Sequence, residues 1–297
     1  MVCLDLSELD DKLIAYTSML SNIFDIQAAY FLHVAKTLDL PDKVVEKYPD
    51  LLAPSDEVIE RKIQGKIDKF FSAPNCANQV VIREGNATDK ILRWSEIKEI
   101  DLIVMGRKSS LKGSGVLPNE LAKVAHCSLL FVPEAASPEI NNVIVPVDFS
   151  RTSGMALEEA LEVKKATQCK LTVQNSYEVP SGYHSIGKSY EEFAEIMRGH
   201  AQEDAEEFIN KKGGSLEDVD IILTLDDERD PAERAYEEAE KLGADLIVIG
   251  SKGRTGIASL LLGSVADKMT QYDTNIPLLV IKNKKENMGF LEALWKL

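Results

Sequence analysis

The sequence predicts an α/β protein made of two tandem doubly wound domains, each with a parallel five-stranded sheet. Three observations favour this fold class. The 297 residues suffice for two domains of typical size, each with its own core. Short apolar runs alternate with helical patterns, which is typical of parallel strands joined by crossover helices. The same series of runs occurs twice along the chain.

The internal repeat is visible in two pairs of segments. Residues 2–7 (VCLDLS) match residues 145–150 (VPVDFS), and residues 101–106 (DLIVMG) match residues 245–250 (DLIVIG). The spacings of 143 and 144 residues are far longer than those of solenoid or propeller repeats. We therefore interpret the chain as a duplicated domain.

The segments between and after the two copies give the boundaries. Residues 133–142 contain two prolines and suit a short connection between neighbouring domains. We predict a first domain at residues 1–134 and a second at residues 141–283. Residues 284–297 are predicted to form an amphipathic tail that is too short to be stable alone.

The elements of each copy follow in the same order. The strands predicted for the second copy are residues 143–147, 170–173, 220–225, 246–249 and 278–281. Its helices are expected to begin after Ser150 as N-cap, near Tyr190 after a long connection, at Pro231 in a first turn, and near Ser264. In the first copy, the clearest elements are strands at residues 28–33 and 79–82 and a helix at residues 58–71.

The most specific motif is a glycine loop in the second copy. Gly250 and Gly253 directly follow an apolar strand, and Gly263-Ser264-Val265 begins after a further nine residues. Glycine lets backbone N–H groups approach an anion closely, and a helix beginning near Ser264 would add unpaired amides. This spacing predicts a loop that holds phosphate.

The first copy carries a degenerate form of this loop. Ser109 stands where the second copy has Gly253, and Asn119-Glu120 replaces Gly263-Ser264. We expect Glu120 to set a carboxylate where phosphate would lie, with Pro118 fixing the turn. Asp5 is retained at the end of the first strand, but the first copy is not expected to bind nucleotide.

Composition narrows the classes of partner. The net charge of −15 argues against a general nucleic-acid or anionic-membrane surface, although Lys252 and Arg254 could favour an anion locally. No apolar run approaches the roughly 20 residues that a membrane-spanning helix needs. The N-terminus has no export pattern, so we expect a cytoplasmic protein.

The four cysteines and four histidines suggest no metal site. The cysteines, which show no CxxC spacing and no nearby histidine cluster, are Cys3, Cys76, Cys127 and Cys169. We interpret them as small packed thiols. No catalytic residue is assigned either.

The motif G-x2-G-x9-G-S, the strand-one aspartate and the duplicated order together resemble a tandem universal stress protein. The resemblance covers nearly the whole chain and implies an adenine-nucleotide hydrolase-like, Rossmann-like fold. The segment LHV at residues 32–34 is also similar to the family's usual sequence after the second strand, whereas the second copy has QNS at residues 174–176.

The ATP-binding branch of this family implies a set of nucleotide contacts. The residues expected at adenine and ribose are Pro146, Val147, Asp148 and Ser176. Those expected on the phosphate side are Ile249, Gly250, Lys252, Gly253, Gly263, Ser264 and Val265. A Mg²⁺ ion is expected to accompany the triphosphate of bound ATP. The resemblance also implies that the two domains pair within one chain, and it leaves a homodimer open.

The function we expect is a stress-response protein that binds ATP, or another adenine nucleotide, in its second domain. It would act by conformation and by contact with a protein partner that the sequence does not identify. One alternative is a weak ATPase, against which we note no second acid near the glycine loop and no Walker-type Lys-Ser/Thr. The other is an interaction module that binds no nucleotide.

Overall fold

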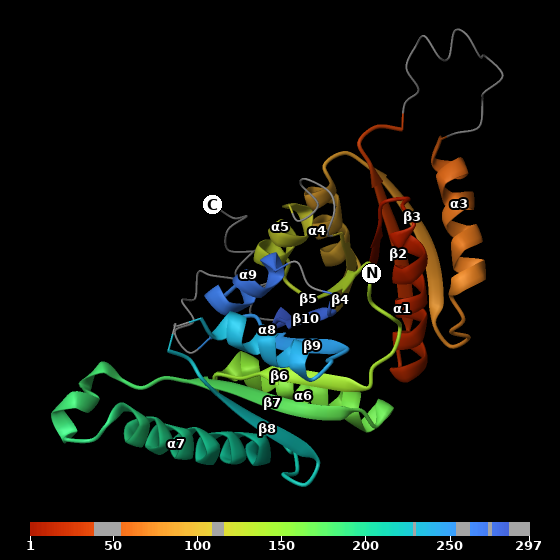
Figure 1. Cartoon of the computed structure of the whole chain (residues 1–297). Helices are drawn as coiled ribbons and strands as arrows, with labels where there is room; N and C mark the ends of the chain where they lie inside the picture. The colour runs from red at the N-terminus through yellow and green to blue at the C-terminus, as the bar shows by residue number, and fades with distance from the viewer. Residues whose placement is uncertain (39–54, 109–115, 228–229, 254–261, 273–274, 285–297) are drawn as a thin grey trace. The chain divides into compact units, whose positions relative to one another are not determined.

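The computed structural model describes residues 1–38, 55–108, 116–227, 230–253, 262–272 and 275–284. The chain divides into two compact units (Figure 1). The first comprises residues 1–121 and 131–139, and the second comprises residues 122–130 and 140–297. Both units are α/β, as the sequence predicts, although the predicted tail lies almost wholly outside the described residues.

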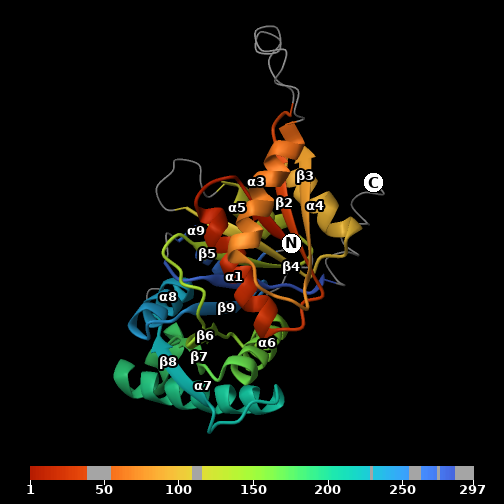
Figure 2. The ribbon, with the colours of Figure 1, turned by 90° about the vertical axis from the view of Figure 1, so that its right-hand side faces the viewer.

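The first unit contains a parallel sheet in the order β3-β2-β1-β4. Its strands are β1 (Val2–Leu4), β2 (Ala28–Ala35), β3 (Ala77–Glu84) and β4 (Leu102–Arg107). Helices α1 (Leu9–Ile23) and α3 (Ser55–Phe70) lie on one face, and α4 (Ala87–Ile97) lies on the other (Figure 2). Helix α5 (Val116–Val124) and strand β5 (Ser128–Pro133) follow. The division between the units passes through both.

The second unit contains a parallel sheet in the order β10-β9-β6-β7-β8. Its strands are β6 (Asn142–Pro146), β7 (Lys170–Tyr177), β8 (Val219–Leu225), β9 (Leu246–Gly250) and β10 (Leu278–Ile281). Its helices are α6 (Arg151–Thr167), α7 (Tyr190–Lys211), α8 (Pro231–Lys241) and α9 (Ser264–Gln271). A short 3-10 helix, η1 (Ser181–Ile186), lies within the connection between β7 and α7.

The helix starts in the second unit have local causes, of which the sequence analysis names Ser150 and Pro231. The Ser150 side chain accepts a hydrogen bond from Ser153 N and caps α6. Ser189 and Glu192 form a capping box at the start of α7. Asp230 caps α8, with Pro231 in the first turn where its missing N–H costs nothing. These caps fix where the helices begin relative to the strand ends.

Several elements differ from the predicted bounds. Strand β7 continues to Tyr177 because its pairing with β8 extends through Tyr177 opposite Leu225. Helix α5 includes Asn119 and Glu120 in its interior, whereas the sequence comparison places them at a helix start. Pro118, in the first turn of this helix, is compatible with the earlier start.

The core is mainly apolar. Phe31, Ile103, Ile144 and Leu157 are among its fully buried side chains. The cysteines Cys76, Cys127 and Cys169 are buried, Cys3 is half-buried, and none of the four is in a disulfide. None of the helices that the structure describes is both long and apolar enough to cross a bilayer.

Candidate functional site

A cavity of about 550 Å³ lies at the carboxyl ends of the strands of the second unit. Parallel α/β sheets bind ligands at this edge. All eleven residues that the sequence proposes for nucleotide binding line it. It has eight further lining residues, namely Ser153, Gln174, Asn175, Glu178, Asp226, Pro231, Ser251 and Ala266. The fold therefore brings the whole predicted set together and adds polar groups to it.

Asp148 is held in a tight turn after β6. Phe149 adopts a left-handed backbone conformation with φ of 63°, and Asp148 Oδ1 accepts a hydrogen bond from Ser150 N at 3.0 Å. The glycine loop lies against the other carboxylate oxygen, because a Cβ added to Gly253 would stand 2.9 Å from Asp148 Oδ2. Asp148 thus links the strand-one edge of the cavity to the loop.

Gly250 is required by packing of the protein itself. A Cβ at this position would lie 2.5 Å from the backbone carbon of Thr152 and 2.6 Å from Ser153 N, both in the first turn of α6. Beyond it, Lys252 N donates a hydrogen bond to Thr152 Oγ1 at 3.2 Å, and Lys252 O accepts one from the Thr152 hydroxyl. The start of α6 therefore holds the first half of the loop.

Gly263 closes the second half of the loop. Its N–H donates to Ser251 O at 2.6 Å, and its carbonyl accepts from Asp267 N at 2.8 Å. As predicted, α9 begins at Ser264, so the amides of its first turn have no partner within the helix and can bind an anion. A side chain at position 263 would press on the backbone of Lys252 and Gly253, at 3.3 Å from both.

The end of β7 forms the opposite side of the cavity. Asn175 is buried, and its Nδ2 donates to Val147 O at 2.8 Å, which fixes the strand-one edge. Gln174 Nε2 donates to Ser176 Oγ at 3.0 Å and to Thr224 Oγ1 at 3.2 Å. The side chains on β7 are therefore held by a hydrogen-bond network.

Two acids in this cavity were missed by the sequence analysis. Glu178 is exposed, whereas Asp226 is buried directly after β8. Both follow strands that lie two or three places from β9 in the order β9-β6-β7-β8, so neither contradicts the expectation that no second acid lies near the glycine loop. The available signal was the position of Asp226 after a predicted strand, at the edge of the sheet where ligands bind. Neither acid belongs to a group of three candidate metal ligands among the described residues.

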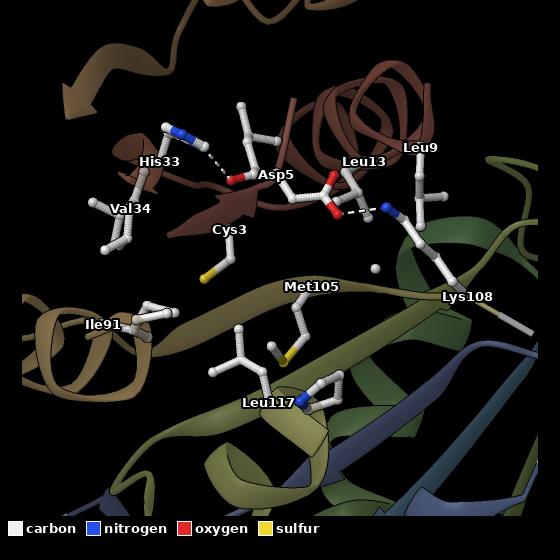
Figure 3. A pocket seen from close by; sticks show the side chains of 15 residues that line it. Cys3, Asp5, Leu9, Leu13, His33, Val34, Ile91, Met105, Lys108 and Leu117 are labelled. Carbon is white, nitrogen blue, oxygen red and sulfur yellow. Dashed lines mark hydrogen bonds and ion pairs between the residues drawn. The ribbon is translucent and has the colours of Figure 1, made fainter. Parts of the chain in front are cut away.

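The first unit has a cavity of about 490 Å³ at the corresponding edge (Figure 3). Its walls are mainly apolar, and Figure 3 shows Cys3, Ile91, Met105 and Leu117 around the open space. At one side, Lys108 Nζ donates to Asp5 Oδ2 at 2.5 Å. Asp5 matches Asp148 at the strand-one edge, and Lys108 matches Lys252 in the loop. In the first copy, these two counterparts form an ion pair with each other.

This ion pair controls the titration of Asp5. Burial by itself would raise the pKa of Asp5, but hydrogen bonds from Lys108 and Ser7 outweigh it and lower the pKa below the ordinary value of 3.8. The carboxylate is therefore stabilised in its charged form by the protein. Asp5 thus already has hydrogen-bond partners within the first unit, namely Lys108 and Ser7.

The phosphate side of the first cavity differs in backbone as well as in sequence. Asn119 and Glu120, which match Gly263 and Ser264, lie inside α5. Glu120 accepts a hydrogen bond from the Thr88 hydroxyl at 2.8 Å. The expectation that Glu120 occupies a phosphate position was therefore wrong, because this carboxylate is turned toward α4 in a continuous helix.

The sequence difference between LHV and QNS conceals a shared interaction. His33 Nδ1 donates to Leu4 O at 2.9 Å, just as Asn175 Nδ2 donates to Val147 O. Strand pairing places His33 opposite Leu4 in the first unit. Histidine and asparagine thus fix the same edge in the two copies, and the departure from the family pattern at Asn175 does not remove this bond.

Comparison with known proteins agrees with the duplicated fold. The model of the universal stress protein family matches twice, at residues 1–133 and 139–282. A universal stress protein of Methanocaldococcus jannaschii is 29% identical over 158 residues, which span 48% of this chain and 94% of the relative.

Solved structures cover the whole tandem arrangement. A universal stress protein from Archaeoglobus fulgidus DSM 4304 has a TM-score of 0.61 at 20% identity, covering 95% of this chain and 97% of its own. A protein of unknown function from Pseudomonas aeruginosa PAO1 has a TM-score of 0.65 at 16% identity, covering 100% of this chain and 97% of its own. Likeness at this level of identity concerns the fold. With both copies matched by the family model, the chain belongs to the universal stress protein family.

Proposed function

We propose that the second unit binds ATP, or another adenine nucleotide, and that the protein acts by conformation and partner contact. The main support is the single cavity that gathers the glycine loop, the first-turn amides of α9 and Asp148. Amides at a helix start favour phosphate, and a carboxylate can accept hydrogen bonds from ribose hydroxyls. The cavity volume of about 550 Å³ also falls within the usual range for small-molecule sites.

A Mg²⁺ ion would accompany the phosphates in this proposal. Three ligands from the described acids, histidines and cysteines do not converge anywhere in the fold. The ion would therefore depend mainly on phosphate oxygens and water, which suits the preference of Mg²⁺ for keeping part of its hydration shell. Its loss should weaken ATP binding without affecting the fold.

The proposed function does not include hydrolysis of ATP. The lysine of the loop, Lys252, lies between the first two glycines, and a P-loop lysine instead follows the last glycine of its motif. Incubation of the protein with Mg-ATP followed by chromatography of the products tests this point. Release of ADP at several equivalents per chain would support the weak ATPase instead.

The binding experiment begins with freshly purified protein. Denaturation, followed by chromatography and mass spectrometry of the released small molecules, should give up to one equivalent of adenine nucleotide per chain. Calorimetry with Mg-ATP on nucleotide-free protein should then give one site. Two equivalents would contradict the assignment of the first cavity, and no binding in either measurement would favour the interaction module.

A further inference from the structure

The cavity of the first unit is nearly as large as that of the second, at about 490 Å³ against about 550 Å³, but one of its walls has a different character. In the second cavity, this wall includes Gln174 and Ser176 on β7, which are joined by a hydrogen bond. The matching residues on β2 are Leu32 and Val34, and both line the first cavity. A hydrogen-bonding wall in one copy is therefore an apolar wall in the other.

The remaining walls of the first cavity are also mainly apolar. Four elements contribute side chains around the open space in Figure 3, namely β1 with Cys3, β4 with Met105, α4 with Ile91 and α5 with Leu117. Water makes few hydrogen bonds against such walls, so an apolar molecule that displaces it is bound favourably. The cavity volume falls within the usual range for small-molecule sites.

The charges at the edge of this cavity favour a neutral ligand. Asp5 and Lys108 form an ion pair there, so their charges balance. An anionic group near Lys108 would also meet the Asp5 carboxylate, and a cationic group near Asp5 would also meet Lys108. A charged ligand would therefore gain little electrostatic energy in exchange for the hydration that it loses.

We propose that the first cavity binds a neutral, mainly apolar small molecule. Its described lining residues all belong to the first unit, so this site does not depend on nucleotide binding in the second. Contact with Leu32, Met105 and Leu117 removes apolar surface of the ligand from water and supplies most of the binding energy. The duplicated chain would then bind a polar ligand in one copy and an apolar ligand in the other.

The first test titrates the full chain with N-phenyl-1-naphthylamine, a neutral apolar dye whose fluorescence rises in apolar surroundings. Wild type should bind one dye molecule per chain, and saturating Mg-ATP should not displace it. Leu117→Trp should weaken dye binding roughly tenfold or more, because the larger side chain takes up part of the cavity. Absence of dye binding to wild type, or displacement of the dye by Mg-ATP, would overturn the inference.

The matched control for this variant is Val116→Trp. Val116 precedes Leu117 in α5, is 58% exposed and is not among the lining residues, so the same substitution there should keep the dye affinity. Circular dichroism checks that both variants fold. Equal dye affinity in the two variants would contradict binding in this cavity.

A second measurement uses the wild-type protein alone. Cys3 is half-buried in the cavity wall, whereas the other cysteines are buried. N-ethylmaleimide, a small neutral reagent, should therefore modify Cys3 first, and excess dye should slow this reaction roughly tenfold while Mg-ATP leaves its rate unchanged. Peptide mass spectrometry identifies the modified residue. An unmodified Cys3, or a rate that the dye does not change, would overturn the inference whether or not the second unit binds nucleotide.

Discussion

The two cavities of this chain occupy the same edge of two copies of one fold, yet their polar groups are arranged in opposite ways. In the second unit, Asp148 lies against Gly253 and the amides of α9 begin at Ser264. In the first, Asp5 is paired with Lys108, and α5 continues through the matching position. A helix therefore starts at the strand-end loop of the second unit, whereas in the first unit the strand-one acid is ion-paired with Lys108 and the matching helix has already begun.

This difference teaches that a glycine loop can be lost through the backbone as well as through side chains. A phosphate site needs amides with no intrahelical partner, and these occur only in the first turn. In the first unit, Asn119 and Glu120 match the start of α9 but lie inside α5. Their backbone N–H groups are therefore not in a first turn and cannot bind phosphate as those of α9 can. The predictions below test which of these differences matters most.

The largest expected effect concerns the two strand-end glycines. Gly250→Ala should lower the free energy of unfolding by about 3 kcal/mol, because its Cβ would meet the backbone of Thr152 at 2.5 Å. Gly106→Ala should cost only about 1 kcal/mol, because its Cβ would meet Leu9 Cδ2, the end of a side chain that can move. Urea denaturation followed by circular dichroism measures both, and equal losses would contradict the packing argument.

The next effect is on nucleotide affinity. Ser264→Asp should weaken Mg-ATP binding roughly 100-fold, because like charges meet where phosphate would contact the start of α9. The fold should persist, since an acid in the first turn of a helix is favourable. Calorimetry gives the affinity and thermal denaturation the stability. Gln271→Asp, at the exposed last residue of the same helix, is the control and should keep the affinity.

The sequence predicts much of this comparison because its signals are local. Strand patterns, the repeat and the cap at Ser150 depend on residues close together in the chain, and the structure confirms them. The start of α5 could have been inferred from Pro118, which suits a first turn, but motif spacing points elsewhere. Asp226 depends on strand order, which brings β8 to the same cavity as β9, and no local pattern encodes that order.

A smaller effect is expected at the bond that both copies share. His33→Ala and Asn175→Ala should each lower the free energy of unfolding by about 1–2 kcal/mol, because the strand-one carbonyl loses its donor. His33→Asn should lose less than His33→Ala, since an amide can supply the same donor. Urea denaturation measures these losses. If His33→Asn is as unstable as His33→Ala, the stabilising role of this donor is contradicted.

The ion pair of the first cavity should contribute little. The Asp5 side chain is 59% exposed, so Lys108→Met should cost about 0.5 kcal/mol at pH 7. The pKa of Asp5 is lowered by the fold, so its stabilising effect is present above the ordinary value of 3.8 and disappears as pH falls through the folded value. Denaturation curves of wild type and variant should therefore converge in acid, and a gap that widens there would contradict this assignment.

The smallest expected effect is no change at all. Ser109→Gly together with Asn119→Gly and Glu120→Ser restores the glycine and serine positions of the second copy, and motif spacing alone predicts a second nucleotide site. We expect no added binding, because positions 119 and 120 lie inside α5 and their N–H groups do not form a first turn. Calorimetry on nucleotide-free protein should give the same number of sites as wild type. A second equivalent of Mg-ATP would show that the side chains, and not the start of the helix, separate the two cavities.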